Sequence, residues 1–238
     1  MEKIIIVIPT YNEDANIVKL TKKLQNIIPQ SLIFVVDDTK DTKIGKFFIK
    51  NKRVNYFLRK NKKGRGSAVL YGLKRSLKNK NSEIFIEMDA DFSHDPKEIK
   101  KNILIFKKKK LDLLISSRYL KESKIFNWSI SRRIFSLLAN FLAKILLKVE
   151  VSDYTNGFRI YSRRSVILIT KKCGRIGDGF IVLSEILLTI KSHDYKIDEV
   201  PSIFINRKRG ASSVNSKLII QSLIGLIKLY FIKKTNKK

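Results

Sequence analysis

The sequence contains few of the residues that cross-link or break a chain. Its 238 residues include one cysteine, four prolines and ten glycines. With Cys173 alone, an intrachain disulfide and a cysteine-based metal cluster are excluded, and nothing requires an oxidising compartment. No repeat, low-complexity block or Pro/Gly-rich linker divides the chain. The length and these absences predict one domain, or one domain with a small appendage.

Acidic residues are also scarce. The chain has 21 Asp and Glu against 50 Lys and Arg, a formal net charge of +29. Such a surplus favours anionic partners, namely nucleic acid, acidic lipid or phosphorylated substrates, although a lysine-rich composition with simply solvated side chains stays open. Most Phe and Tyr residues lie in strand or apolar-helix patterns and are not interleaved with the basic ones. We therefore rank a nucleic-acid-binding module last and expect no nucleic acid partner.

Long apolar runs are missing too. Lys217 and Lys233 enclose 15 residues, among them Lys228, and a helix that crosses a bilayer needs roughly 20. The N-terminus begins directly with a strand-like run, Lys3 to Pro9, and lacks a signal-peptide pattern. We therefore expect a cytoplasmic protein.

The hydrophobic pattern alternates between strands and helices. Ile4 to Ile8 is a continuous apolar run, as in a strand buried on both faces. Further strands are predicted at 32–36, 54–58, 84–88, 111–116, 158–161 and 197–205. Helices are predicted at 17–28, 131–147, 180–190 and 216–232, with another that has Asp95 as N-cap and Pro96 as first residue and ends near Lys107. The alternation predicts an α/β fold with a mostly parallel sheet covered by helices.

Polar residues follow three of the predicted strands directly. These clusters are 10–13 (Thr-Tyr-Asn-Glu), Asp37-Asp38 and Asp89-Ala90-Asp91. Asp and Asn are common turn formers, so one such cluster would mean little. Three of them at the carboxyl ends of parallel strands, where ligands of such sheets bind, predict a site at that edge.

The residue types in these clusters suit a phosphorylated ligand held by a metal. Asp89 and Asp91 offer the oxygen ligands that Mg²⁺ or Mn²⁺ prefers. An Asp-x-Asp triplet is weak evidence alone, and its place after a strand strengthens it. Asp37 and Asp38 are candidates to bind a base or ribose, and the alternative is that Asp38 caps a turn.

A basic, glycine-containing segment, 63–67 (Lys-Gly-Arg-Gly-Ser), precedes a helical pattern. Its backbone amides and cationic side chains are candidates to approach a phosphate, and a flexible basic turn is the alternative. The segment lacks the spacing of the P-loop and of the dinucleotide fingerprint. An ATPase or a dehydrogenase is therefore not indicated.

An ordered series of motifs carries a family resemblance from about residue 4 to about residue 230. The motifs are Ile8-Pro9-Thr10-Tyr11-Asn12-Glu13, Val35-Val36-Asp37-Asp38, Met88-Asp89-Ala90-Asp91-Phe92-Ser93-His94, Ser117-Arg118-Tyr119, Asn127-Trp128, Arg132-Arg133, Asp153-Tyr154-Thr155-Asn156-Gly157-Phe158-Arg159, Glu199-Val200-Pro201 and Arg207-Lys208-Arg209-Gly210-Ala211-Ser212. The chain resembles the family 2 glycosyltransferases and, among them, the dolichyl-phosphate (polyprenyl-phosphate) mannosyltransferases.

The resemblance implies a GT-A fold and an inverting transfer of mannose from GDP-mannose to a polyprenyl phosphate. It implies a catalytic domain at 1–215 and a C-terminal amphipathic, membrane-peripheral helix at 216–238. The residues implied for the nucleotide sugar are Pro9, Tyr11, Glu13, Asp37, Asp38, Asp89, Arg207 and Arg209. Those implied for the metal are Asp89 and Asp91, those for the acceptor phosphate are Arg118, Arg132 and Ser136, and those for catalysis are Asp91, Arg118 and Arg132.

Two positions depart from the family pattern, and both the donor and the acceptor have an open alternative. Ser93 stands where some relatives have a Gln that joins the metal, so it is a candidate to contact a metal ligand and not the metal itself. A shortened segment leaves Asp41 without an assigned role. The donor alternative is UDP-glucose or another nucleotide sugar used on undecaprenyl phosphate. The acceptor alternative is a glycan hydroxyl, with Glu185 or Asp178 as base. A phosphate acceptor needs no such base, and arginines suit it.

Two apolar helical stretches carry polar stripes. Ser136, Asn140 and Lys144 recur every four residues in one, and Lys217, Gln221 and Lys228 mark the other. No acidic residue and nine basic ones follow Val200. These features predict in-plane helices on an anionic membrane surface, and core helices or a docking surface for a separate membrane subunit are the alternatives. The expected location is peripheral, on the cytoplasmic face of a membrane.

Overall fold

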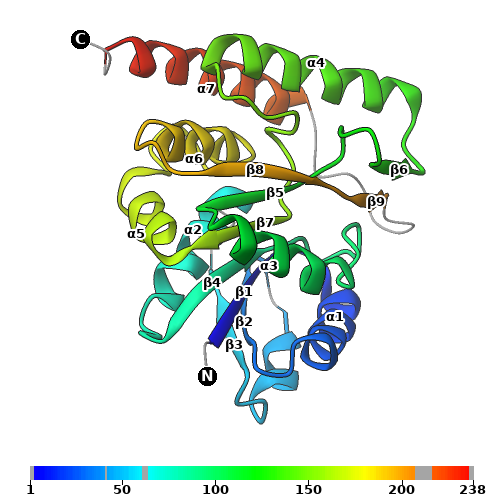
Figure 1. Ribbon diagram of the computed structural model, residues 1–238. Helices are drawn as coiled ribbons and strands as arrows, with labels where there is room; N and C mark the ends of the chain where they lie inside the picture. The colour runs from blue at the N-terminus through cyan, green and yellow to red at the C-terminus, as the bar shows by residue number, and fades with distance from the viewer. Residues whose placement is uncertain (1–2, 41, 61–63, 207–215, 236–238) are drawn as a thin grey trace.

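A computed structural model describes residues 3–40, 42–60, 64–206 and 216–235. A seven-stranded sheet, in the order β3-β2-β1-β4-β7-β5-β8, forms its centre, and a two-stranded sheet pairs β6 with β9 (Figure 1). The strands are β1 (Lys3–Thr10), β2 (Leu32–Asp37), β3 (Val54–Leu58), β4 (Ser82–Glu87), β5 (Leu113–Ser117), β6 (Lys124–Phe126), β7 (Arg159–Ser162), β8 (Ile197–Pro201) and β9 (Ile203–Ile205). The helices are α1 (Asp14–Ile27), the 3₁₀ helix η1 (Ile44–Phe48), α2 (Arg65–Ser76), α3 (Glu98–Lys109), α4 (Ile130–Leu147), α5 (Arg163–Lys172), α6 (Ile181–Lys191) and α7 (Ser216–Thr235).

The central sheet is mostly parallel, as predicted. Strand β7 is antiparallel to both of its neighbours, β4 and β5, and the other neighbouring pairs are parallel. In the register, Thr10 lies beside Asp37, and Val7 lies beside Glu87. The carboxyl ends of β1, β2 and β4 therefore meet at one edge, and this register brings the three predicted polar clusters together.

The sheet is buried on both faces, because helices cover each side. Along β1, Ile4, Ile6 and Ile8 face one core cluster, while Ile5 and Val7 face the other. The first cluster is filled from α1 and α3, and the second from α2, α5 and α6. This two-sided burial explains the unbroken apolar run in the sequence.

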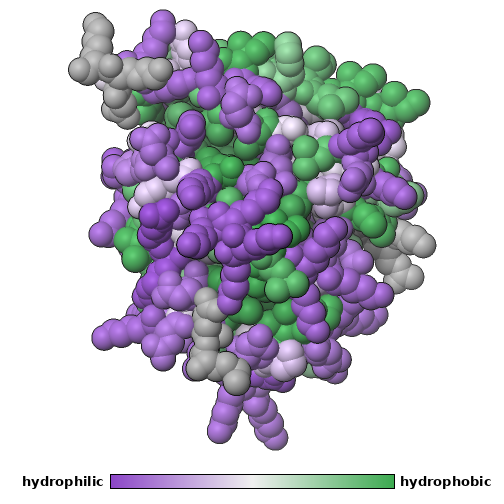
Figure 2. Space-filling model, in the orientation of Figure 1, coloured by the Kyte–Doolittle hydropathy of each residue, from purple (hydrophilic) through white to green (hydrophobic). Residues whose placement is uncertain are grey.

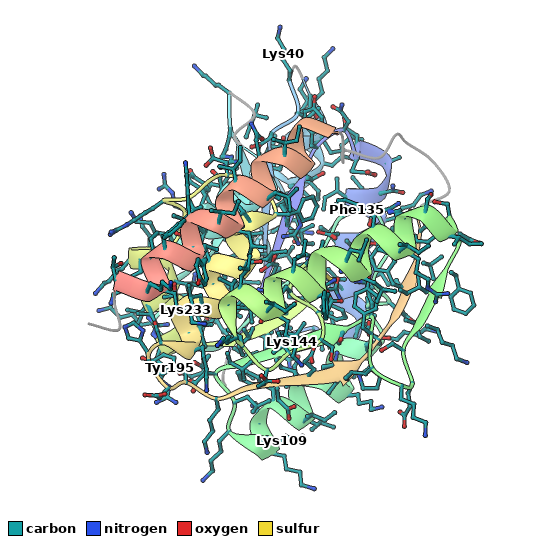
Figure 3. The ribbon with its side chains drawn as sticks, turned by 90° about the horizontal axis from the view of Figure 1, so that it is seen from above. Lys40, Lys109, Phe135, Lys144, Tyr195 and Lys233 are labelled. Carbon is teal, nitrogen blue, oxygen red and sulfur yellow. The ribbon has the colours of Figure 1, made fainter. Side chains whose placement is uncertain are left out.

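Helices α4 and α7 lie side by side at one end of the molecule, beyond α6 (Figure 1). Figure 3, viewed from above, shows the pair crossing that end, with Phe135 and Lys144 on α4. Helix α7 is part of the core, since Leu226 and Leu229 are buried in the second cluster. Its Lys233 Nζ donates to the carbonyl of Leu147, 2.5 Å away. A domain boundary at residue 215 stays a prediction.

No described helix combines the length and the apolar character needed to span a membrane.

Two expectations about the elements need correction, and one helix was missed. Helix α3 begins at Glu98 instead of Pro96, because the Asp95 carboxylate accepts from the Lys97 amide (3.0 Å) in a turn that precedes the helix. The predicted strand 197–205 is broken at Ser202 into β8 and β9, which belong to different sheets. Helix α5 was not predicted at all.

Candidate active site

Asp37, at the end of β2, has a buried and hydrogen-bonded carboxylate. Its Oδ1 accepts from the Thr39 amide (2.8 Å), its Oδ2 accepts from the Tyr56 hydroxyl (2.8 Å), and its side chain is fully buried. Burial and the adjacent carboxylate raise the pKa of Tyr56. Contact between Asp37 and a nucleotide stays a prediction.

Asp38 is held by a bidentate ion pair. Arg59 donates from Nε and Nη2 to its two oxygens at 2.5 and 2.6 Å, and from Nη1 to Ser67 at the start of α2 (2.9 Å). Beside it, Pro9 lies in β1 next to Val36, and Tyr11 is exposed. The Glu13 carboxylate accepts from Asn16 (2.7 Å). The structure therefore brings the predicted base-binding residues to one corner, and their contacts with a nucleotide stay predictions.

Asp89, just after β4, is the carboxylate at the centre of the edge. Arg65 Nε and Nη2 both lie 2.7 Å from its Oδ1, and its Oδ2 lies 4.0 Å from His94 Nε2. Burial opposes ionisation, but the Arg65 charge outweighs it, so the pKa of Asp89 lies below its ordinary value. The side chain keeps 27% of its surface exposed, so a ligand can reach this carboxylate.

The neighbouring residues suit a divalent cation that shares its coordination with a ligand. Asp91 accepts from the Ser93 amide (3.0 Å), and Ser93 Oγ is buried without a hydrogen-bond partner among the described residues. Within those residues, no group of three or more His, Cys, Asp or Glu side chains is placed to hold a metal. Two carboxylates, with phosphate and water completing the shell, are the usual arrangement for Mg²⁺. The site fits a metal that arrives with a phosphorylated donor.

His94 joins the carboxylates to the second half of the site. Its buried ring accepts from the Asp89 amide at Nδ1 (3.4 Å), and its Nε2 lies 2.8 Å from Asn156 Oδ1. The ring also packs against Phe158 and Phe204, with centroids 5.3 and 5.4 Å away. His94 stood in a motif of the resemblance, but nothing in the sequence assigned it this bridging position.

Two predicted phosphate-binding arginines meet at one indole ring. We call Trp128, Arg118, Arg132, Tyr119 and Phe204 the Trp128 cluster. The guanidinium carbons of Arg118 and Arg132 lie 5.3 and 4.5 Å from the Trp128 ring centroid, within cation–π range. Arg132 also donates from Nη1 to Asn206 (2.9 Å). The sequence placed these arginines 14 residues apart, and the fold makes them neighbours.

Arg118 is oriented by a buried carboxylate. Its Nε and Nη2 donate to the two oxygens of Asp153 (2.8 and 2.7 Å), and Nη2 also donates to Thr155 (2.6 Å). Burial opposes ionisation of Asp153, but the charge and hydrogen bonds of Arg118 outweigh it and lower its pKa. These bonds fix the plane of the Arg118 guanidinium before any ligand binds. Contact of Arg118 with an acceptor stays a prediction.

Helix α4 connects the Trp128 cluster to the outside of the molecule. Its Ser136 accepts from the Tyr119 hydroxyl (2.6 Å), and its Asn140 accepts from the Tyr154 amide (2.7 Å). The polar side of α4 therefore faces inward. Ser136, predicted to bind the acceptor phosphate, lies one turn from Arg132 on that inward side.

The outward side of α4, together with α7, is apolar. We call these exposed side chains the apolar cap: Ile130, Ile134, Phe135, Leu137, Leu138, Phe141, Leu142 and Ile145 of α4, and Ile220, Leu223, Ile224, Ile227, Phe231 and Ile232 of α7. Figure 2 shows apolar surface gathered along the top of the molecule, over these helices. Contiguous exposed apolar patches mark interaction surfaces.

Of the two candidate bases for a hydroxyl acceptor, Glu185 has a carboxylate that backbone amides already engage, and the role of Asp178 as a base stays an untested alternative. The Glu185 carboxylate accepts from the Gly174 and Arg175 amides (2.7 and 3.3 Å), so it supports that loop, and burial raises its pKa. The Asp178 carbonyl accepts from the Ser67 amide (3.0 Å) beside the start of α2. Arg207, Arg209 and Asp41 lie outside the described residues.

Comparison with known proteins identifies the family. The family model described as glycosyl transferase family 2 matches residues 5–169. The chain belongs to this family. Polyprenol monophosphomannose synthase of Mycolicibacterium smegmatis is 30% identical over 227 residues, which cover 93% of this chain and 84% of that protein. Dolichol-phosphate mannosyltransferase of Pyrococcus furiosus is 32% identical over 234 residues, which cover 95% of this chain and 63% of that protein.

The solved structures confirm the fold of this family 2 glycosyltransferase. Glucosyl-3-phosphoglycerate synthase of Mycobacterium tuberculosis, in complex with Mn²⁺, uridine diphosphate and glucosyl-3-phosphoglycerate, superposes with a TM-score of 0.64 at 16% identity. The match covers 93% of this chain and 76% of that one. The GT-A prediction is therefore correct.

Proposed function

We propose that this glycosyltransferase transfers mannose from GDP-mannose to a polyprenyl phosphate and works as a peripheral protein on the cytoplasmic face of a membrane. The names of the two curated relatives support the sugar and the acceptor class. The proposed product is a polyprenyl-phosphate mannose with an inverted anomeric centre.

One observation carries the acceptor assignment. Helix α4 presents Arg132 and Ser136 to the Trp128 cluster on its inner side and the apolar cap on its outer side. A molecule with a phosphate at one end and an apolar tail at the other matches both sides of this helix. A sugar hydroxyl of a soluble glycan would use neither the cap nor the arginines.

The proposed reaction requires little proton transfer by the protein. A lipid phosphate is ionised at pH 7, so no side chain has to deprotonate it before its oxygen attacks the anomeric carbon. The new sugar–phosphate bond forms as the bond to the nucleoside diphosphate breaks. Arg118, held in orientation by Asp153, and Arg132 bring this anion close to an anionic donor through charge-assisted hydrogen bonds.

The donor side follows from the carboxyl edge of the sheet. Asp89 and Asp91 would hold Mg²⁺ or Mn²⁺, which supplies stabilisation of the charge on the departing diphosphate. Pro9, Tyr11, Glu13 and Asp38 border the corner proposed for the guanosine. Arg207 and Arg209 are proposed to reach the pyrophosphate.

The test is transfer of labelled sugar to polyprenyl phosphate in detergent, from GDP-mannose and in parallel from UDP-glucose, with Mn²⁺ or with EDTA. We expect product from GDP-mannose with Mn²⁺, and a loss of more than about 100-fold for Asp91→Asn, because one metal ligand is removed. Asp198→Asn is the matched control, since Asp198 forms an exposed pair with Lys109.

Each half of the proposal has its own contrary result. Product from UDP-glucose and none from GDP-mannose would replace the donor. Transfer to a glycan hydroxyl, with none to the lipid phosphate, would replace the acceptor. Full transfer in EDTA would remove the metal from the proposal.

A further inference from the structure

A buried chain of polar contacts leads from the core to Asp89, and no local sequence pattern indicates it. The Tyr161 hydroxyl of β7 donates to Glu87 Oε2 (2.7 Å), and Arg65 Nη1 donates to Glu87 Oε1 (2.6 Å). Arg65 then contacts Asp89 Oδ1 through Nε and Nη2. Tyr161 and Glu87 are fully buried. Asp89 is thus the exposed end of a chain anchored within the sheet.

The surroundings of Arg65 are shaped to hold its guanidinium in place. Its Nη2 also donates to the carbonyl of Gly157 (3.2 Å), and its guanidinium carbon lies 5.8 Å from the Phe180 ring centroid. A Cβ on Gly157 would stand 1.8 Å from Nη2, so only glycine leaves room for this position. The side chain keeps 13% of its surface exposed.

The contacts of Arg65 have two consequences for a metal site. Both of its contacts with Asp89 go to the same oxygen, Oδ1. The other oxygen, Oδ2, lies outside hydrogen-bond distance of His94. The third contact of Arg65 neutralises Glu87, whose buried charge would otherwise have no cationic partner among the described residues. A lysine keeps the charge but has no planar fork that spans two carboxylates.

We infer that Arg65, anchored by Glu87 and Tyr161, is a positioning residue that presents Asp89 Oδ2 to the metal of a metal–nucleoside diphosphate. This role rests on the proposed function in requiring a metal-bound donor at this edge, but it does not depend on the base or on the acceptor. Residues that orient metal ligands typically change metal affinity by about 10- to 100-fold when mutated.

The experiment measures Mn²⁺ binding to the intact protein without any acceptor, by the electron paramagnetic resonance of free Mn²⁺, in the presence of GDP and separately of UDP. The Arg65→Lys variant is expected to weaken Mn²⁺ binding by about 10-fold or more. Tyr161→Phe, which removes only the distal hydroxyl, is expected to weaken it by about two- to fivefold.

Two controls separate positioning from general damage. Arg75→Lys alters an arginine on the same helix whose guanidinium stacks on Tyr71 (5.1 Å), and it should leave Mn²⁺ binding unchanged. Nucleotide binding in EDTA should be the same for wild type and Arg65→Lys, because positioning acts on the metal ligand alone. If Arg65→Lys fails to fold, Tyr161→Phe makes the same comparison.

The outcomes separate this inference from the proposed donor. Mn²⁺ binding that is supported by UDP and not by GDP overturns the GDP-mannose assignment. Wild type and Arg65→Lys are then compared for Mn²⁺ binding in the presence of UDP. Wild-type Mn²⁺ affinity in Arg65→Lys, or no Mn²⁺ binding with either nucleotide, overturns the positioning role. An equal loss of metal-free nucleotide binding in Arg65→Lys overturns it as well, because the residue would then support the whole site.

Discussion

Buried arginines order this site, and each is paired with a fully buried carboxylate, Asp153 or Glu87. Arg118 pairs with Asp153, and Arg65 pairs with Glu87 and Asp89. Such pairs contribute little net stability compared with apolar residues, but losing one partner leaves an uncompensated buried charge. Their value here is orientation, because each guanidinium is held in one plane before a ligand arrives.

Asp153→Asn tests this reasoning at the Arg118 pair. At pH 7 we expect the free energy of unfolding to fall by about 3 kcal/mol, because Arg118 stays buried without a counter-charge. Since the pKa of Asp153 is lowered in the folded protein, its ionisation stabilises the fold above the ordinary value of 3.8 and this contribution is lost as the pH falls through the folded pKa. The gap between wild type and variant should therefore narrow in acid.

Urea denaturation at a series of pH values between neutral and acid measures that gap. The control is Asp198→Asn, whose exposed ion pair with Lys109 should contribute no more than about 1 kcal/mol. A cost for Asp153→Asn that is as small as the control's, or that does not change with pH, would contradict this account of the pair.

Sequence patterns indicated the candidate metal ligands but not the residues that position them. Asp89 and Asp91 were found because a short spacing follows a strand. Arg65 and Gly157 are 92 residues apart, and no local pattern links them. The partners of a buried charge are set by strand order and register, and these became known only with the fold.

At the scale of elements, strong periodicity made most strands and helices predictable. Helix α5 was missed because it follows β7 without a turn: Ser162 ends the strand, and its Oγ accepts from the Ser165 amide (3.2 Å) as the cap of the helix. The break between β8 and β9 comes from Glu98, whose carboxylate accepts from the Ser202 hydroxyl and the Ile203 amide (2.6 and 2.8 Å). The Glu98 contacts are tertiary and have no local signature, whereas the Ser162 cap is a local signal that was not used.

The orientation of α4 was the element-scale feature that sequence could not decide. Its polar stripe was visible, but a stripe faces water on most surface helices. Here Ser136 and Asn140 face inward because Tyr119 and the Tyr154 amide need partners there. The apolar side is left outside as a result.

Asn140→Ala is the corresponding test. It leaves the buried Tyr154 amide without an acceptor, so we expect a loss of about 1–3 kcal/mol in the free energy of unfolding. Amide hydrogen exchange should also rise in 149–156, the loop that α4 holds. Lys144→Ala on the same helix removes only an exposed pair with Glu150 and should change neither quantity appreciably. Equal effects of the two substitutions would show that Asn140 does not anchor the helix.

At the scale of the whole molecule, charge and apolar surface are distributed differently. The apolar cap occupies one end, over α4 and α7 (Figures 1 and 2), and basic side chains such as Lys228, Lys233 and Lys234 come from the same helix α7. An apolar plane with basic neighbours matches an anionic bilayer surface, where acyl chains meet negative head groups. Docked this way, the inner side of α4 would place the Trp128 cluster directly beneath the head groups.

This arrangement predicts that membrane binding and catalysis can be separated. Phe141 and Phe231, 61% and 60% exposed, lie on the cap, one on each helix. Replacing both with Glu should weaken binding to vesicles of anionic phospholipid by at least about tenfold, because each buried aromatic ring contributes about 1.5–3 kcal/mol and the added charges are repelled. Transfer to a short-chain polyprenyl phosphate in detergent should stay near wild type, since this assay needs no bilayer and the phosphate-binding residues Arg132 and Ser136 lie on the inner side of α4. Phe47→Glu, at an exposed ring on η1, is the matched control and should bind vesicles normally. Sedimentation with vesicles at low and high salt measures the apolar and the electrostatic contributions to membrane binding. Wild-type binding should fall as the salt concentration rises, because the basic residues are screened.

Undiminished vesicle binding by the double variant would mean that the cap contacts something other than the bilayer. A separate membrane subunit would then be the partner to test for.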